Sequence, residues 1–150
     1  MNNISIYPAQ AEDISAISHL LTILFEQEAD FKPDIHRQQQ AVAMIIDNPE
    51  SGHFLVMKQH GTVIGTVNLL YLTSTAMGGK AAILEDMVIH PDWRAMGLGK
   101  QLLQRAVEHA RQQGCLRLTL LTDSDNKKAQ TLYQNCGFHL SKMVPMRLEF

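Results

Sequence analysis

The sequence lacks the features that would place the chain in a membrane or in an oxidising compartment. No apolar run approaches the length of about 18 residues that is read as a membrane-spanning helix. The first residues, Met1 to Ser5, carry neither a basic stretch nor a long apolar run, so we expect no signal peptide. The two cysteines, Cys115 and Cys136, form no CxxC pair, and reduced thiols in a cytoplasmic protein are the simplest interpretation.

The sequence also gives little support for a metal site or for a nucleic-acid partner. None of the seven histidines lies in an HExxH pattern or beside a cysteine at ligand spacing, so we expect no bound metal. The 13 basic side chains are outnumbered by 15 acidic ones. Because nucleic-acid-binding proteins usually carry a basic excess, this balance argues against such a role.

The length and composition are those of an ordinary globular chain. The sequence has 150 residues, of which 45% are hydrophobic and 19% are charged. A chain of this size can bury roughly two thirds of its unfolded surface in one core. We therefore expect a single domain over residues 1–150.

The spacing of apolar residues predicts helices and strands that interleave in the order β-α-α-β-β-β-α-β-α-β. An early hairpin turned at His60-Gly61 adds antiparallel strands, so we expect a mixed α/β sheet with helices on both faces. The predicted elements are a strand around Ile4 and Ile6, a helix from about Glu12, a helix over 36–47, strands over 54–56, 63–71 and 81–89, a helix from Leu98 stopped by Gly114, a strand over 115–121, a helix over 126–136 and a strand around 143–150.

The segment most informative about chemistry is the loop between the strand at 81–89 and the helix that begins at Leu98. A strand that enters a glycine-containing loop and then a helix forms an anion site, because backbone N–H groups converge there and the helix dipole adds positive potential. Gly97 and Gly99 have no Cβ, so a pyrophosphate can approach the main chain closely. Arg94 and Lys100 add positive charge at the rim.

Two other phosphate-binding loops fit less well. A dinucleotide-binding fingerprint requires a third glycine where this chain has Leu102. A P-loop requires Ser or Thr where this chain has Gln101, and a glycine where it has Arg94.

Two motifs resemble those of the GNAT superfamily of N-acetyltransferases. Arg94-x-x-Gly97-x-Gly99 is similar to its pyrophosphate-binding pattern, and residues 126–138 resemble its second coenzyme A-binding segment, N-x-x-A-x-x-L-Y-x-x-x-G-F. Both motifs occur in the expected order, and the resemblance covers nearly the whole chain. Ala95 and Met96 depart from the commonest loop, and the loss of a basic residue at position 96 bears on cofactor affinity.

The resemblance implies the fold, the cosubstrate and the residues that hold it. The sheet is expected to splay open between the strands at 81–89 and 115–121, with the pantetheine arm of acetyl-CoA in the gap. That arm is expected to hydrogen-bond like an added strand to the backbone of Met87, Val88 and Ile89. Asn126 matches a position that contacts the arm, but a simple N-cap is an equal alternative. The pyrophosphate would be held by the loop residues Arg94, Ala95, Met96, Gly97, Leu98, Gly99 and Lys100.

The implied reaction is direct attack of a primary amine on the thioester in a ternary complex. Tyr133 matches the tyrosine near the sulfur, where its hydroxyl can donate a hydrogen bond or a proton to the leaving thiolate; the alternative is a core tyrosine on an apolar helix stripe. Glu85 is the candidate base that takes the proton of the amine. Asp86 has the same chemistry and would point to the opposite face unless a bulge breaks the alternation. A similar Glu-Asp pair occurs at this place in glucosamine 6-phosphate N-acetyltransferases of the superfamily.

The sequence leaves the acceptor unnamed. The segment from Phe25 to Asp34, which in this fold borders the acceptor site, contains four carboxylates and one lysine with two phenylalanines. It suggests a small-molecule or peptide amine that carries a further positive charge, although a solvated helix end explains the same composition. A non-catalytic coenzyme A-binding sensor is the main alternative function, and an aminoacyl-tRNA-acetylating toxin is disfavoured by the charge balance. A homodimer is left open.

Overall fold

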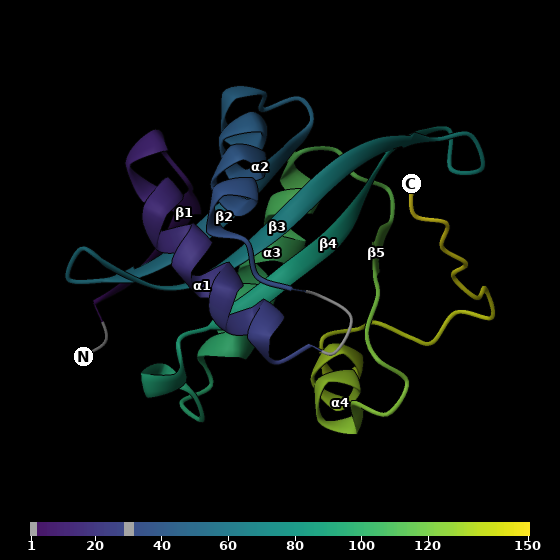
Figure 1. The fold of residues 1–150 in the computed structure, drawn as a ribbon. Helices are drawn as coiled ribbons and strands as arrows, with labels where there is room; N and C mark the ends of the chain where they lie inside the picture. Colours follow the sequence, from purple (N-terminus) through teal and green to yellow (C-terminus); the bar gives the residue numbers. More distant parts are fainter. Residues whose placement is uncertain (1–2, 29–31) are drawn as a thin grey trace.

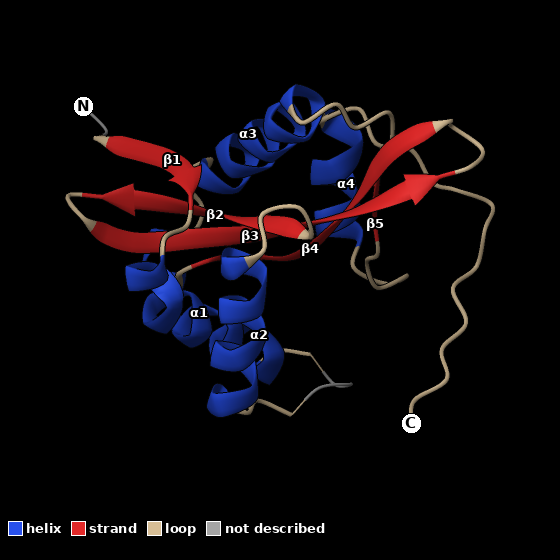
Figure 2. Cartoon of the chain, turned by 90° about the horizontal axis from the view of Figure 1, so that it is seen from above, coloured by secondary structure: helices blue, strands red, loops and turns tan. Residues whose placement is uncertain are grey.

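The chain folds into a five-stranded sheet with two helices packed on each face (Figures 1 and 2). The computed structural model describes residues 3–28 and 32–150. The first half contains β1 (Ile4–Pro8), the 3-10 turn η1 (Ala11–Asp13), α1 (Ile14–Glu26), α2 (Ile35–Asp47), β2 (Gly52–Gln59) and β3 (Thr62–Ser74). The second half contains β4 (Gly79–Ile89), the 3-10 turn η2 (Pro91–Trp93), α3 (Leu98–Gln112), β5 (Leu118–Leu120) and α4 (Lys127–Asn135).

The strands lie in the sheet in the same order as in the sequence. Neighbours β1 to β4 pair antiparallel: short hairpins join β2 to β3 and β3 to β4, whereas α1 and α2 lie between β1 and β2 in the chain. Strand β5 pairs parallel to β4 after the crossover through α3. The β4–β5 pairing is limited to three residue pairs, of which the last joins Leu84 to Leu120. Beyond Leu84, β4 therefore keeps only β3 as a described neighbour, and the two parallel strands part as expected from the sequence.

Two apolar cores lie on the opposite faces of the sheet. On one face Phe54 and Val56 of β2 pack with Ile17 of α1 and Val42 of α2. On the other face their neighbours Leu55 and Met57 join the core formed by α3, with Leu102, Leu103 and Ala106. Because successive strand residues point to opposite faces, the continuous apolar run of β2 is what a sheet covered on both sides needs.

The element order predicted from the sequence is confirmed up to α4, but its last strand is not formed. Residues 139–150 contain no helix or strand, and their side chains are exposed. The alternation of Met146, Leu148 and Phe150 fits a strand, but a strand also needs a neighbouring edge, and this tail runs apart from the sheet (Figures 1 and 2). Strand β5 is likewise shorter than the predicted range 115–121.

Among the described residues, no helix combines the length and the apolar character that crossing a membrane would require.

Candidate functional site

The open part of β4 is the first component of the site. Val88 and Ile89 pair with Thr66 and Gly65 of β3, whereas on the β5 side no described strand faces Met87, Val88 or Ile89. An extended ligand can therefore add to this edge as a strand would. The three residues predicted to bind the pantetheine arm thus lie where the main chain is available on one side.

The loop that follows β4 presents main-chain N–H groups at the start of α3. Ala95 and Gly97 both have left-handed backbone conformations, with φ of 63° and 75°. Gly97 is the N-cap residue of α3, and among the described residues no side chain accepts a hydrogen bond from the first turn of that helix. The N–H groups of Leu98, Gly99 and Lys100 are consequently available to an anion, and the helix dipole favours one there.

Gly99 is not required by the packing of the protein itself. Among the described residues outside its own helix, a Cβ at this position would meet Leu132 Cδ2 at 3.9 Å and Ile89 Cγ1 at 4.0 Å, which are ordinary contact distances. The absence of a side chain therefore has no internal explanation, but it keeps the main chain accessible to a phosphate group. The residues present fit the pyrophosphate of acetyl-CoA.

The predicted rim cation Arg94 is engaged with the protein. Its Nε donates a hydrogen bond of 3.0 Å to the Ile89 carbonyl. With the Gln27 amide oriented so that its oxygen faces the guanidinium, that oxygen accepts from both terminal nitrogens at 3.2 and 3.3 Å. Arg94 thus ties the loop to the end of β4 and to the residue after α1. Its phosphate contact stays a prediction.

Helix α4 brings the second motif beside this loop. Leu132 lies within contact distance of the Gly99 position, and its neighbour Tyr133 packs edge-to-face on Phe138 with ring centroids 6.1 Å apart. Burial raises the pKa of the Tyr133 hydroxyl above its ordinary value. Asn126 caps the helix, since its Oδ1 accepts from the Ala129 N–H at 3.2 Å. The capping alternative for Asn126 is therefore observed, and its contact with the cofactor stays a prediction.

A β-bulge places the two candidate bases on the same side of the sheet. The β3–β4 register shifts between Thr66, which pairs with Val88, and Asn68, which pairs with Glu85. Within this irregularity Asp86 has a φ of 54°, a conformation that non-glycine residues adopt rarely. Because the bulge breaks the alternation of the strand, Glu85 and Asp86 line one pocket.

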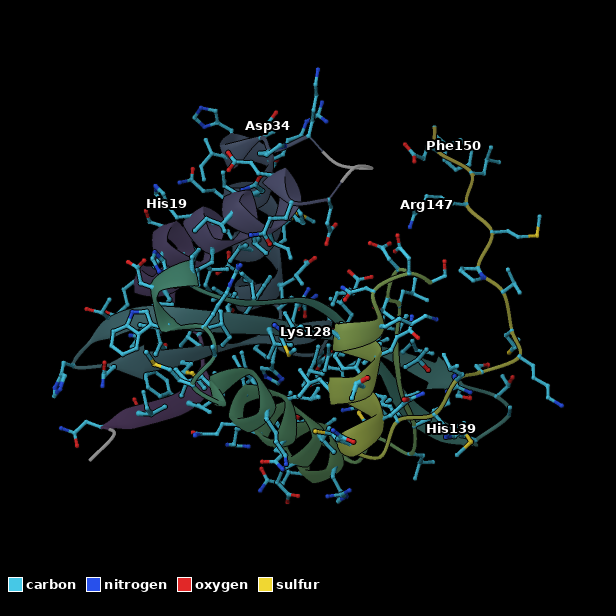
Figure 3. The ribbon with its side chains drawn as sticks, turned by 90° about the horizontal axis from the view of Figure 1, so that it is seen from below. His19, Asp34, Lys128, His139, Arg147 and Phe150 are labelled. Atoms are coloured by element: carbon cyan, nitrogen blue, oxygen red, sulfur yellow. The ribbon has the colours of Figure 1, made fainter. Side chains whose placement is uncertain are left out.

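That pocket lies between the sheet and helices α1 and α2 and has a volume of about 330 Å³. Its sheet wall contributes Glu85, Asp86 and Asn68 together with the apolar side chains of Phe54 and Leu70. The wall formed by the helices and the segment between them is lined by Leu21, Phe25, Lys32, Asp34, Arg37, Gln38, Ala41, Val42 and Ile45. Figure 3 shows Asp34 at the end of this helical layer.

Asn68 is the functional candidate that the sequence analysis missed. Its side chain is 2% exposed, and its Oδ1 has no hydrogen-bond partner among the described groups. A buried acceptor without a partner is costly and therefore points to a donor that arrives with a ligand. The sequence does show Asn68 as the one amide side chain in the largely apolar strand predicted from Val63 to Tyr71.

The ionisation of Asp86 bears directly on which carboxyl group in the pocket can accept a proton. Burial, followed by the charges of Glu85 and Glu28, raises the pKa of its carboxyl to about 6. Glu85 is exposed. A carboxylate with a pKa near neutrality is a better proton acceptor than an ordinary aspartate, yet it is still ionised at pH 7. The contribution of Glu28 also brings part of the predicted acidic segment into the electrostatics of this site; Asp30 of that segment lies outside the described residues.

Comparison with known proteins identifies relatives of matching length. The model of the acetyltransferase (GNAT) family matches residues 15–138. The chain is 32% identical over 137 residues to the uncharacterized N-acetyltransferase YhfO of Bacillus subtilis, and the match covers 89% of each chain. It is 31% identical over 90 residues to a glucosamine 6-phosphate N-acetyltransferase of Trypanosoma brucei brucei, covering 59% of this chain and 58% of that one. A thialysine N-epsilon-acetyltransferase of Bos taurus is 30% identical over 77 residues, covering 51% and 45%.

Solved structures share the fold. A possible acetyltransferase from Clostridium difficile superposes with a TM-score of 0.88 at 15% identity, covering 98% of this chain and 97% of that one. A predicted acetyltransferase from Clostridium acetobutylicum, solved with acetyl-CoA, has a TM-score of 0.79 at 15% identity and covers 96% of each chain. At this level of identity the similarity supports the fold alone.

Proposed function

Because this chain belongs to the acetyltransferase (GNAT) family, and is therefore an acetyl-CoA-dependent acyltransferase, we propose that it acetylates a primary amine by direct attack in a ternary complex. We choose an amine as the acceptor because the pocket contains a set of hydrogen-bond acceptors. Glu85, Asp86 and the unpartnered Asn68 Oδ1 line it together. An amine supplies the N–H donors that such a set needs.

The cosubstrate would be held by the two main-chain surfaces described above. Bound acetyl-CoA supplies an activated acetyl thioester. The N–H groups at the start of α3 would hold its pyrophosphate, and the free edge of Met87, Val88 and Ile89 would align the pantetheine arm. Gly99 keeps the approach to the loop open.

Asp86 is the proposed general base. The sequence made Glu85 the candidate base, with Asp86 as the alternative of the same chemistry, and the buried position and raised pKa of Asp86 favour Asp86 instead. As the amine nitrogen attacks, its proton passes to the Asp86 carboxylate, directly or through one water. The Asn68 oxygen would hold a second N–H and so orient the nitrogen lone pair toward the acetyl carbon.

Tyr133 would stabilise the leaving group. Its raised pKa makes the phenol a weaker acid than a thiol, so complete proton transfer to the departing thiolate is uphill. Donation of a hydrogen bond to the sulfur is the role that fits this acidity.

The acceptor is proposed to be a small molecule. A volume of about 330 Å³ lies at the lower end of the range for small-molecule sites. Glu85 and Asp86 stand on the sheet wall. On the helical wall Asp34 forms an ion pair with Arg37 at 3.5 Å, and Lys32 adds a further positive charge. This polarity suits an acceptor with an anionic group remote from its amine, as glucosamine 6-phosphate and thialysine, the substrates named for two relatives, both have.

The acidic segment at residues 25–34 predicts a different preference, for an acceptor that carries an extra positive charge. Matched primary amines that carry a neutral, a cationic or an anionic second group would separate the two. Lys32→Gln should lower kcat/KM selectively for the anionic amines, and Glu28→Gln selectively for the cationic ones. Equal loss across the panel would reject both charge preferences.

The test of the function itself is release of free thiol from acetyl-CoA in the presence of this panel. Amine-dependent release that is abolished in Asp86→Asn, with coenzyme A binding retained in calorimetry, supports the proposal. Tight coenzyme A binding without release for any amine would instead favour the sensor function. The single domain and the cytoplasmic location stay predictions from the sequence.

A further inference from the structure

A polar side chain is buried in the helical wall of the acceptor pocket. Gln38 of α2 lines this pocket and is only 7% exposed. The other buried residue of α2 is Val42, one turn further along the helix, and it packs with Ile17 of α1 in an apolar core. Burial of an amide costs free energy unless its groups are hydrogen-bonded, so the partners of Gln38 indicate what this side chain does.

The amide nitrogen of Gln38 holds α2 to α1, the helix beside it on the same face of the sheet (Figure 2). Nε2 donates one hydrogen bond of 2.9 Å to the Ser18 carbonyl and another of 2.9 Å to the Thr22 hydroxyl oxygen. The Thr22 hydroxyl in turn donates to the Ser18 carbonyl at 3.1 Å. Both N–H groups of the amide are thus used within the protein. We call this arrangement of Gln38, Ser18 and Thr22 the Gln38 clamp.

The amide oxygen of the same side chain fixes the start of α2. Gln38 Oε1 accepts from the main-chain N–H of Asp34 at 2.8 Å, and Asp34 is the N-cap residue of α2. The Asp34 carboxylate accepts from the N–H groups of His36 and Arg37 and forms an ion pair with the Arg37 guanidinium at 3.5 Å. The clamp therefore holds the turn that carries the charged groups of the helical wall.

The clamp thereby fixes the separation between the two walls of the pocket. Glu85 and Asp86 lie on the sheet wall, and Lys32 and Arg37 lie on the helical wall, on either side of the N-cap residue. The two helices pack on the sheet through apolar side chains. Apolar contacts have no preferred direction, so they leave the position of α2 along α1 weakly determined. The hydrogen bonds of the clamp are directional and determine that position.

We propose that Gln38 is a positioning residue that determines acceptor specificity, because it sets the length of acceptor that can reach both walls. The inference rests on the proposed function, with the amine held at Asp86 and an anionic group held at the helical wall. An acceptor that is one methylene too short or too long would lose one of these two contacts. One methylene in an enclosed pocket is worth a factor of about 10 or more in kcat/KM.

A series of unbranched ω-amino carboxylates of graded length tests this inference through the release of thiol from acetyl-CoA. The parent chain should prefer one length, and kcat/KM should fall about tenfold for the two neighbours that differ by one methylene. Gln38→Met keeps the length of the side chain and removes its hydrogen-bonding groups, so the dependence on length should flatten. The change should appear in KM, whereas kcat at saturating amine and the Kd for coenzyme A should stay the same.

Gln40→Met is the matched control, because it makes the same substitution at an exposed position of the same helix. This control should keep the length preference of the parent chain. Gln38→Glu is a second test variant, which serves if Gln38→Met folds poorly. It retains an acceptor for the Asp34 N–H and loses both donors toward α1, so the dependence on length should flatten here as well.

The outcomes separate this inference from the function on which it rests. Absence of thiol release with every amine would refute the proposed function and the inference with it. Release without any length preference in the parent chain would overturn the inference alone. A length preference that both Gln38 variants retain, with kcat/KM reduced equally at every length, would give Gln38 a purely structural role and would also overturn it.

Discussion

Glu85 and Asp86 are consecutive residues of β4, and both line the same pocket because Asp86 adopts a φ of 54° within a β-bulge. The bulge brings two carboxyl groups to one side of the sheet at the place where β4 parts from β5. Their mutual repulsion is one reason why the pKa of Asp86 rises to about 6. The strained backbone thereby prepares a proton acceptor that regular pleating would not provide.

This coupling predicts how the ionisation of Asp86 responds to its neighbour. Removal of the Glu85 charge in Glu85→Gln should lower the pKa of Asp86, because the charged form is then opposed only by burial and by Glu28. A carbon-detected NMR titration of the Asp86 carboxyl should place its midpoint near 6 in the parent chain and lower in the variant. The acidic limb of kcat/KM should shift in the same direction. An unchanged midpoint would contradict the coupling.

Replacement of Asn68 is expected to separate stability from function. Asn68→Leu removes a buried acceptor without a partner, so the free energy of unfolding should stay the same or rise, by roughly 1 kcal/mol. The amine loses one of its anchors, so kcat/KM for the acceptor should fall while the Kd for coenzyme A is unchanged. Urea unfolding and steady-state kinetics measure the two effects. A strong loss of stability would identify Asn68 as structural.

Tyr133→Phe isolates the hydroxyl from the packing of the ring. The phenyl group can keep the contact with Phe138, so the fold and the affinity for coenzyme A should be retained. If the hydroxyl supports the leaving sulfur, kcat should fall by a factor of about 10² or more. Normal turnover in this variant would leave Tyr133 with a packing role only.

Gly99→Val tests the pyrophosphate loop. Because a Cβ at this position meets no described atom outside its own helix closer than 3.9 Å, the melting temperature should change little. The added side chain should nevertheless obstruct the phosphate, and calorimetry should record a weaker Kd for coenzyme A. Gly99→Ala provides the graded control with a smaller effect. Unchanged affinity for coenzyme A in the valine variant would contradict the assignment of this loop to pyrophosphate binding.

A pair formed by buried His109 and half-buried His53 makes stability depend on pH. His109 Nε2 lies 3.3 Å from His53 Nδ1, which also hydrogen-bonds to the Tyr71 hydroxyl. Burial, then the charges of His53 and Arg105, lowers the pKa of His109 to about 4. At His109 the unfolded chain therefore binds more protons than the folded one between about pH 6.5 and 4, so the contribution of this residue to stability falls as the pH falls through this window. The raised pKa of Asp86 acts in the opposite direction below about pH 6, so the contribution of His109 is read from the difference between the parent chain and a variant without this histidine. The full effect is on the order of 3 kcal/mol.

Urea unfolding measured at steps from pH 7.5 to 4.5 checks this dependence. His109→Leu should flatten the curve within the window, since the leucine cannot be protonated. An equally steep decline in the variant would assign the pH dependence to other groups.

The sequence by itself determined the order of the elements and the two motifs, because both depend on local chemistry. The spacing of apolar residues places α3 and α4 correctly, and the strand-loop-helix pattern with its glycines predicts main-chain N–H groups at the free N-terminus of α3. Asn126 as an N-cap follows from the same short-range reasoning.

Only the tertiary structure decided which groups share a site. Pleating predicts that Glu85 and Asp86 face apart, and the bulge that reverses this depends on the pairing of β3 with β4. Asn68 is a candidate site residue only because helices α1 and α2 close a pocket over it. The strand predicted around 143–150 is not formed, because a strand requires an edge to pair with, and the position of an edge is a property of the whole sheet rather than of the segment.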